Sequence, residues 1–128
     1  MVAETDAIRL LLVDDEVGYL DVLAKRLTHR GFKVTTASSG AEAIRALRNW
    51  DFELAVVDLK MEDMDGIEVL KVLKKMDPAL QVIILTGHGS ERAARDGIAH
   101  GAFDYLIKPI GLEELIARIH DALSSKST

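Results

Sequence analysis

The sequence predicts an α/β domain in which a parallel β-sheet is covered by helices on both faces. Two observations indicate this fold. Short, continuous apolar runs alternate with longer stretches whose apolar residues recur at helical spacing. Several apolar runs end directly in acidic or hydroxyl residues, as expected where buried parallel strands reach the carboxyl edge of a sheet. The length of 128 residues fits one such domain with a sizeable core.

Regular structure is expected to begin with a buried strand and an amphipathic helix. Residues 8–13 are expected to form the first strand, with the apolar run Leu10–Val13, and the acidic loop Asp14–Asp15–Glu16 follows it. Residues 17–30 carry apolar side chains at helical spacing with charged residues between them, which predicts a helix. Gly31 is expected to end this helix, because glycine readily adopts the left-handed conformation found there.

The second and third strands differ in their expected burial. Residues 32–36 alternate between apolar and polar, which favours a strand near the sheet edge. Ser39 and Glu42 match a capping box and predict a helix that runs to about residue 49. Residues 54–58 form an apolar run that ends in a carboxylate, so this strand is expected at the sheet centre.

The second half of the chain continues the alternation, with helices predicted over residues 67–76, 90–100 and 112–123 and strands over residues 81–86 and 103–107. Asp65 starts the first of these helices, and Asp77–Pro78 ends it. Gly97 interrupts the second helix, which we expect to be the least firmly packed. Lys108–Pro109 ends the fifth strand, and residues 124–128 form a polar tail that frays from the core of about 8–123.

Five strands that alternate with five helices favour a single flavodoxin-like, doubly wound domain with strand order 2-1-3-4-5. In that order the first and third strands are neighbours. Their carboxyl ends would bring Asp14, Asp15 and Asp58 together, with Thr86 and Lys108 on the far side of the same edge.

Composition narrows the classes of function. The chain is 48% hydrophobic and 29% charged, with a net charge of −5, which argues against direct nucleic-acid binding by this domain. It has no cysteine, so thiol chemistry and cysteine metal sites are excluded. No apolar stretch is long enough to span a membrane, and the start of the chain does not resemble a signal peptide. A cytoplasmic location is expected.

The acidic cluster predicts a cation site. Three carboxylates roughly 6 Å apart repel by about 3 kcal/mol per pair at an effective dielectric near 20. A divalent ion would neutralise Asp14, Asp15 and Asp58, and oxygen ligands in an open site favour Mg²⁺ over Ca²⁺, with Mn²⁺ able to substitute.

This arrangement also suits acceptance of a phosphoryl group by Asp58. The carboxylate would be the nucleophile, while the metal and Lys108 neutralise the transferring oxygens. Thr86 could hydrogen-bond the product, and Gly87 leaves space for a donor. Each residue alone has an ordinary explanation as a helix cap, a turn residue or a solvated lysine, but their joint placement favours a site.

The chain resembles the receiver domains of two-component response regulators. The motifs that carry the resemblance span about residues 8–123 and are Leu11–Leu12–Val13–Asp14–Asp15–Glu16, Val57–Asp58, Met64–Asp65–Gly66, Leu85–Thr86–Gly87 and Gly101–Ala102–Phe103–Asp104–Tyr105–Leu106–Ile107–Lys108–Pro109. The family often has proline where Glu62 stands, and Lys60 and His88 occupy positions that vary within it. We hypothesise that Lys60 influences the lifetime of the phosphoryl group.

The resemblance implies a phosphorylation-dependent signalling switch. Asp58 would accept a phosphoryl group from a sensor histidine kinase or a phosphotransfer protein, and Mg²⁺ would be held by Asp14, Asp15, Asp58 and the backbone carbonyl of Lys60. Thr86 and Tyr105 would form the switch pair, Lys108 would contact the phosphoryl group, and the peptide before Pro109 would be cis. The fourth helix, fifth strand and fifth helix would form the output face. The domain would catalyse only its own phosphorylation and slow dephosphorylation.

Several alternatives stay open at this point. A receiver-like interaction module that phosphorylation does not switch is the main one, and a metal-dependent hydrolase is another. A nucleotide or flavin binder is weakly supported, because neither GxxxxGK[ST] nor GxGxxG is present. The cognate kinase, the signal, the output protein or domain, and phosphorylation-linked homodimerisation are not determined by the sequence.

Overall fold

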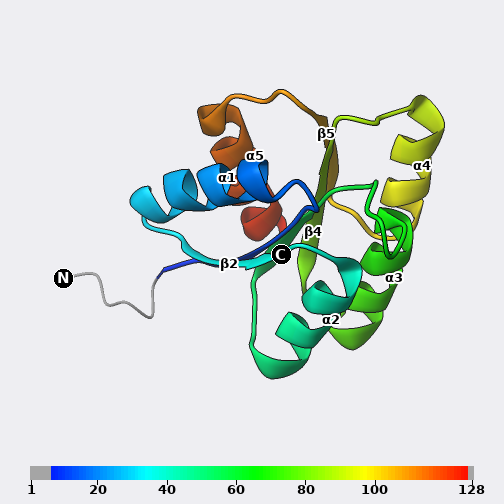
Figure 1. The fold of residues 1–128 in the computed structure, drawn as a ribbon, viewed down its shortest axis with the longest axis horizontal. Helices are drawn as coiled ribbons and strands as arrows, with labels where there is room; N and C mark the ends of the chain where they lie inside the picture. Colours follow the sequence, from blue (N-terminus) through cyan, green and yellow to red (C-terminus); the bar gives the residue numbers. More distant parts are fainter. Residues whose placement is uncertain (1–6, 127–128) are drawn as a thin grey trace.

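The computed structural model describes residues 7–126 and shows a parallel sheet between two layers of helices (Figure 1). The strands lie in the order β2-β1-β3-β4-β5, which confirms the predicted order. Their bounds are β1 (Arg9–Val13), β2 (Lys33–Ala37), β3 (Leu54–Val57), β4 (Gln81–Thr86) and β5 (Asp104–Ile107). Residues 1–6, which precede the expected core, and the end of the expected tail, 127–128, lie outside the described residues.

Helices cover both faces of the sheet, with bounds α1 (Val17–His29), α2 (Gly40–Asn49), α3 (Gly66–Met76), α4 (Glu91–Ala99) and α5 (Leu112–Lys126). Figure 1 shows α1 and α5 on one face and α2, α3 and α4 on the other. Each layer packs against its own apolar cluster on the sheet. No helix within residues 7–126 is both long and apolar enough to cross a membrane.

The central strands are continuously apolar because each contributes side chains to both clusters. Leu11 and Val13 of β1 pack in the cluster that includes residues of α2 and α3, whereas Leu10 and Leu12 pack with residues of α1 and α5. All four residues of β3 are buried. Most residues of β2 are exposed or half-buried, which confirms its prediction as the edge strand.

Side-chain caps fix the start of α2 and tie it to a distant loop. The Ser39 hydroxyl accepts a hydrogen bond from the Glu42 N–H at 3.1 Å. The Glu42 carboxylate accepts from the Ser38 N–H at 3.0 Å, one residue earlier than a capping box predicts. Asp63, in the loop after β3, accepts from the N–H groups of Gly40 and Ala41, each at 3.0 Å. These bonds hold the pKa of Asp63 below its ordinary value.

The end of α5 differs from the prediction. Residues 124–126 continue the helix, so the expectation that the polar tail frays is wrong over these positions. No glycine or proline follows Leu123 to stop the helix, and serine costs only about 0.5 kcal/mol relative to alanine in a helix. By contrast, Gly97 is the one buried residue of α4, as expected for a lightly packed helix.

Gly66 closes the loop after β3 by packing tightly against the backbone of residues 58 and 59. Its N–H donates to the Leu59 carbonyl at 2.8 Å, and a Cβ at this position would clash with the Asp58 carbonyl oxygen and the Leu59 Cα. We therefore predict that Gly66→Ala destabilises the fold by about 1–3 kcal/mol in urea unfolding, because backbone atoms must move.

Gly18→Ala is the matched control for that substitution. A Cβ on Gly18, in the first turn of α1, would meet no atom within 4 Å. This variant should be as stable as the wild type or slightly more stable, because alanine has the higher helix propensity. Equal stabilities of the two variants would contradict the proposed tight closure.

Candidate functional site

Two acidic residues lie side by side at the carboxyl edge of the sheet because of strand pairing. Val13 pairs with Val57 in the register of β1 and β3, so the next residues, Asp14 and Asp58, emerge together. The Asp58 N–H donates to the Val13 carbonyl at 3.0 Å, and the Asp14 N–H donates to the Ala37 carbonyl at 3.1 Å. The backbone therefore holds both acids rigidly beyond the last strand residues.

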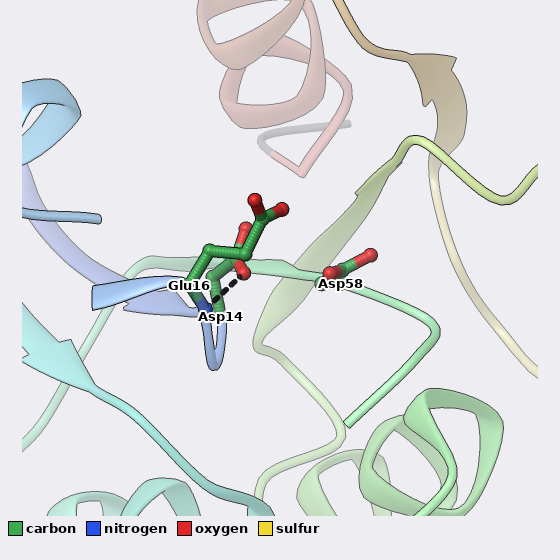
Figure 2. Close-up of side chains that lie close together, drawn as sticks. All are labelled: Asp14, Glu16 and Asp58. Atoms are coloured by element: carbon green, nitrogen blue, oxygen red, sulfur yellow. Dashed lines mark hydrogen bonds between the residues drawn. The ribbon is translucent and has the colours of Figure 1, made fainter. Parts of the chain in front are cut away.

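The carboxylate cluster contains Asp14, Glu16 and Asp58, whose ligand oxygens lie within 4.8 Å of one another (Figure 2). Asp14 and Asp58 are only 5% and 3% exposed, whereas Glu16 is exposed. The predicted member Asp15 is half-buried and is not one of these three. The Glu16 N–H donates to Asp14 Oδ1 at 2.9 Å, a local turn that apolar spacing does not reveal. Asp15 as a metal ligand stays a prediction.

Lys108 is the cation that faces this cluster. Its Nζ lies 2.6 Å from Asp14 Oδ2, 3.3 Å from Glu16 Oε1 and 3.8 Å from Asp58 Oδ2. Its backbone N–H donates to the Thr86 carbonyl at 2.9 Å, and the expected cis peptide before Pro109 is present. Burial acts to lower the pKa of Lys108, but the hydrogen bond and charge of Asp14 raise it above the ordinary value.

The site retains unbalanced negative charge. Burial raises the pKa of Asp14, and this effect outweighs the hydrogen bond from Lys108. Asp58 Oδ1 is buried and has no hydrogen-bond partner among residues 7–126. Three carboxylates with one ammonium group leave an excess of two negative charges when all are ionised. Carboxylate oxygens with an orphaned acceptor fit a hard divalent cation such as Mg²⁺.

The predicted switch residues both bind the loop between β4 and α4. Thr86 is fully buried, and its hydroxyl accepts from the His88 N–H at 3.1 Å. The half-buried Tyr105 accepts from the Ser90 N–H at 3.2 Å. Between these bonds, a Cβ on Gly87 would meet nothing within 4 Å, which agrees with the open space expected there. Lys60 is exposed in the loop after Asp58.

Sequence reasoning placed Glu16 in the acidic loop but did not assign it to the cluster with Asp58, and it missed Tyr19. The ring of Tyr19 lies 4.2 Å from Lys108 Nζ, measured to the ring centroid. Burial raises the pKa of its phenol, so the side chain is neutral. The spacing of Glu16 and Tyr19, three residues apart at the start of a helix, is the signal that places them on one side.

Comparison with known proteins gives one consistent result. The family model described as the response regulator receiver domain matches residues 10–120. The chain is 42% identical over 118 residues to the transcriptional regulatory protein GlrR of Escherichia coli (strain K12), which covers 92% of this chain and 27% of that protein. The chain thus spans about a quarter of that relative.

The solved structures that resemble this chain come from the same family. A CheY-like receiver domain protein from Methanospirillum hungatei JF-1 has a TM-score of 0.91 and 30% identity, covering 95% of this chain and 98% of that one. A response regulator from Burkholderia pseudomallei, solved with a phosphorylated aspartic acid, a calcium ion and citrate, has a TM-score of 0.85 and 29% identity, covering 92% and 69% of the respective chains.

The raised pKa of Asp14 gives a pH-dependent prediction. At a pH below 3.8, the pKa of this carboxyl group in the unfolded chain, Asp14 is protonated in both the folded and the unfolded state. As the pH rises from there through the higher folded pKa, ionisation favours the unfolded state, and the free energy of unfolding falls. Relative to Asp14→Asn, the metal-free wild type should lose stability as pH rises, by at most about 1.4 kcal/mol per pH unit.

Urea unfolding of both proteins in a chelating buffer measures this difference. Asp21→Asn, which removes an exposed acid farther along α1, is the control for the loss of one carboxylate. Parallel stability curves for the wild type and Asp14→Asn would show that burial of Asp14 has no such energetic effect.

Proposed function

The chain belongs to the response regulator receiver domain family, and we propose that Asp58 is the residue that accepts its phosphoryl group. The domain is a phosphorylation-dependent switch of two-component signalling. The observation that carries the assignment of Asp58 is its buried carboxylate, in which one oxygen has no hydrogen-bond partner among residues 7–126 and the other lies 3.8 Å from an ammonium group. The Burkholderia pseudomallei relative, whose structure holds a phosphorylated aspartic acid, supports it.

The proposed reaction transfers a phosphoryl group from a phosphohistidine of a sensor kinase or a phosphotransfer protein. A carboxylate oxygen of Asp58 forms a bond to phosphorus as the phosphorus–nitrogen bond breaks, and the electron pair returns to the imidazole, giving an acyl phosphate. Lys108 neutralises charge on the phosphoryl oxygens. The domain reacts once per chain and then slowly loses the group, so it is a phosphoacceptor rather than a turnover enzyme.

Mg²⁺ is the proposed cofactor, with Mn²⁺ able to substitute. Asp14 and Asp58 are its proposed ligands, with Asp15 and the backbone carbonyl of Lys60 added from the family resemblance. When bound, the ion supplies positive charge opposite the phosphoryl oxygens. The excess negative charge of the cluster and the orphaned Asp58 Oδ1 support this assignment.

The proposed signal passes through Thr86 and Tyr105 to the face formed by α4, β5 and α5. Both residues bind the loop that leads into α4, and α4 itself is lightly packed. We propose that residues 1–128 are a receiver domain in the cytoplasm that controls an output protein or domain, as the names of its transcriptional relatives suggest. We assign direct nucleic-acid binding to that output protein or domain. Homodimerisation on phosphorylation is one proposed way in which the receiver domain controls the output.

Replacement of the acceptor tests the proposed function. The wild type, incubated with a small phosphodonor and Mg²⁺, should gain one phosphoryl group by intact mass, because a single carboxylate is the nucleophile. Asp58→Asn should gain none, since an amide oxygen forms no acyl phosphate. The exposed-acid variant Asp51→Asn should gain one group. Labelling of Asp58→Asn at the wild-type level would overturn the assignment.

Metal binding is tested without any phosphodonor. Mg²⁺ at one hundred times its Kd should stabilise the wild type by about 2.7 kcal/mol, because it binds only the folded state. Asp14→Asn should lose most of this gain, and Asp51→Asn should keep it. Denaturant unfolding with and without Mg²⁺ measures the gain. An undiminished gain in Asp14→Asn would exclude Asp14 as a ligand.

A further inference from the structure

The ammonium group of Lys108 has an aromatic neighbour in addition to its carboxylate partners. The distance of 4.2 Å from Nζ to the centroid of the Tyr19 ring is within the range of a cation–π interaction. The Lys108 side chain is only 12% exposed. Because such attraction strengthens when the cation is desolvated, this contact is placed where it has an energetic effect.

Separate elements hold the two partners of this contact. Tyr19 lies in the first turn of α1, where the next residue, Leu20, donates its N–H to the Glu16 carbonyl at 2.9 Å. The ring is half-buried and packs against the apolar cluster shared with α5. Lys108 is anchored at the end of β5 by its backbone bond to Thr86. The Tyr19 ring is therefore held in place beside the more flexible side chain of Lys108.

The ammonium group of Lys108 lies closer to Asp14 than to Asp58. Its shortest contact, 2.6 Å, is to Asp14, and its distance to Asp58 is 3.8 Å. A cation bound by Asp14 would weaken the shortest contact, and the long side chain of Lys108 has many alternative rotamers in solvent. The ring face attracts the ammonium group without adding another negative charge to a cluster that already has an excess.

We propose that Tyr19 is a positioning residue for Lys108, whose ring face keeps the ammonium group beside Asp58 when Asp14 is engaged by a cation. The proposal rests on the proposed function in one respect, namely that Lys108 neutralises the transferring phosphoryl group. Tyr19 touches neither the phosphoryl donor nor the reacting oxygen in this role. Phenylalanine can replace it, since the same ring face is kept, whereas leucine cannot.

Nuclear magnetic resonance of the metal-free protein tests the contact itself. Protons above an aromatic face are shifted upfield, so the ε-methylene protons of Lys108 should resonate upfield of those of exposed lysines. Their signals are assigned by their loss in Lys108→Arg. Tyr19→Phe should keep the shift and Tyr19→Leu should lose it. Random-coil positions in the wild type and Tyr19→Phe would overturn the proposal, even if the leucine variant failed to fold.

Phosphorylation kinetics test the consequence of the contact. With a small phosphodonor and saturating Mg²⁺, Tyr19→Phe should react at the wild-type rate and Tyr19→Leu about threefold to tenfold more slowly. A wild-type rate for a folded Tyr19→Leu would overturn the proposal, as would equally slow reaction of both variants. Failure of the wild type to be phosphorylated would instead refute the proposed function, while the resonance shift would still test the position of Lys108.

Discussion

The ammonium group of Lys108, held within 4 Å of three carboxylates, is the interaction on which the carboxyl edge of this domain depends. Strand pairing forces Asp14 and Asp58 together in a buried position, and their mutual repulsion would oppose folding without a counter-charge. One ammonium group offsets this repulsion only partly. The remaining negative charge leaves the site ready for a divalent cation, so a cost in folding is linked directly to the chemistry of phosphoryl transfer.

The loops around that charge cluster are constrained to different degrees, and the difference matches their proposed roles. The loop after β3 is closed by Gly66 against the backbone and joined to α2 by Asp63, so it presents Asp58 rigidly. The loop after β4 is held by single hydrogen bonds to Thr86 and Tyr105 and leads into the lightly packed α4. A rigid loop at the proposed acceptor beside a weakly held loop suits a two-state switch.

Tyr19 shows how a residue outside the reacting set can belong to the same electrostatic system. Carboxylates attract the ammonium group strongly but add charge to a site that has too much of it. An aromatic ring attracts the same group through its quadrupole, and the Tyr19 ring also packs against the apolar cluster. The site thus combines charge neutralisation by Lys108 with a neutral surface that limits where Lys108 can go.

The sequence by itself determined the elements, the strand order and the placement of Asp14, Asp58, Thr86 and Lys108 at one edge, because apolar periodicity and strand ends are local signals. Only the tertiary structure decided that Glu16 joins the carboxylate cluster, that Asp63 caps a helix in a different part of the chain, and that Tyr19 faces Lys108. It also extended α5 to Lys126. Side-chain partners such as these depend on rotamers and on segments far apart in the chain, which spacing along the sequence does not encode.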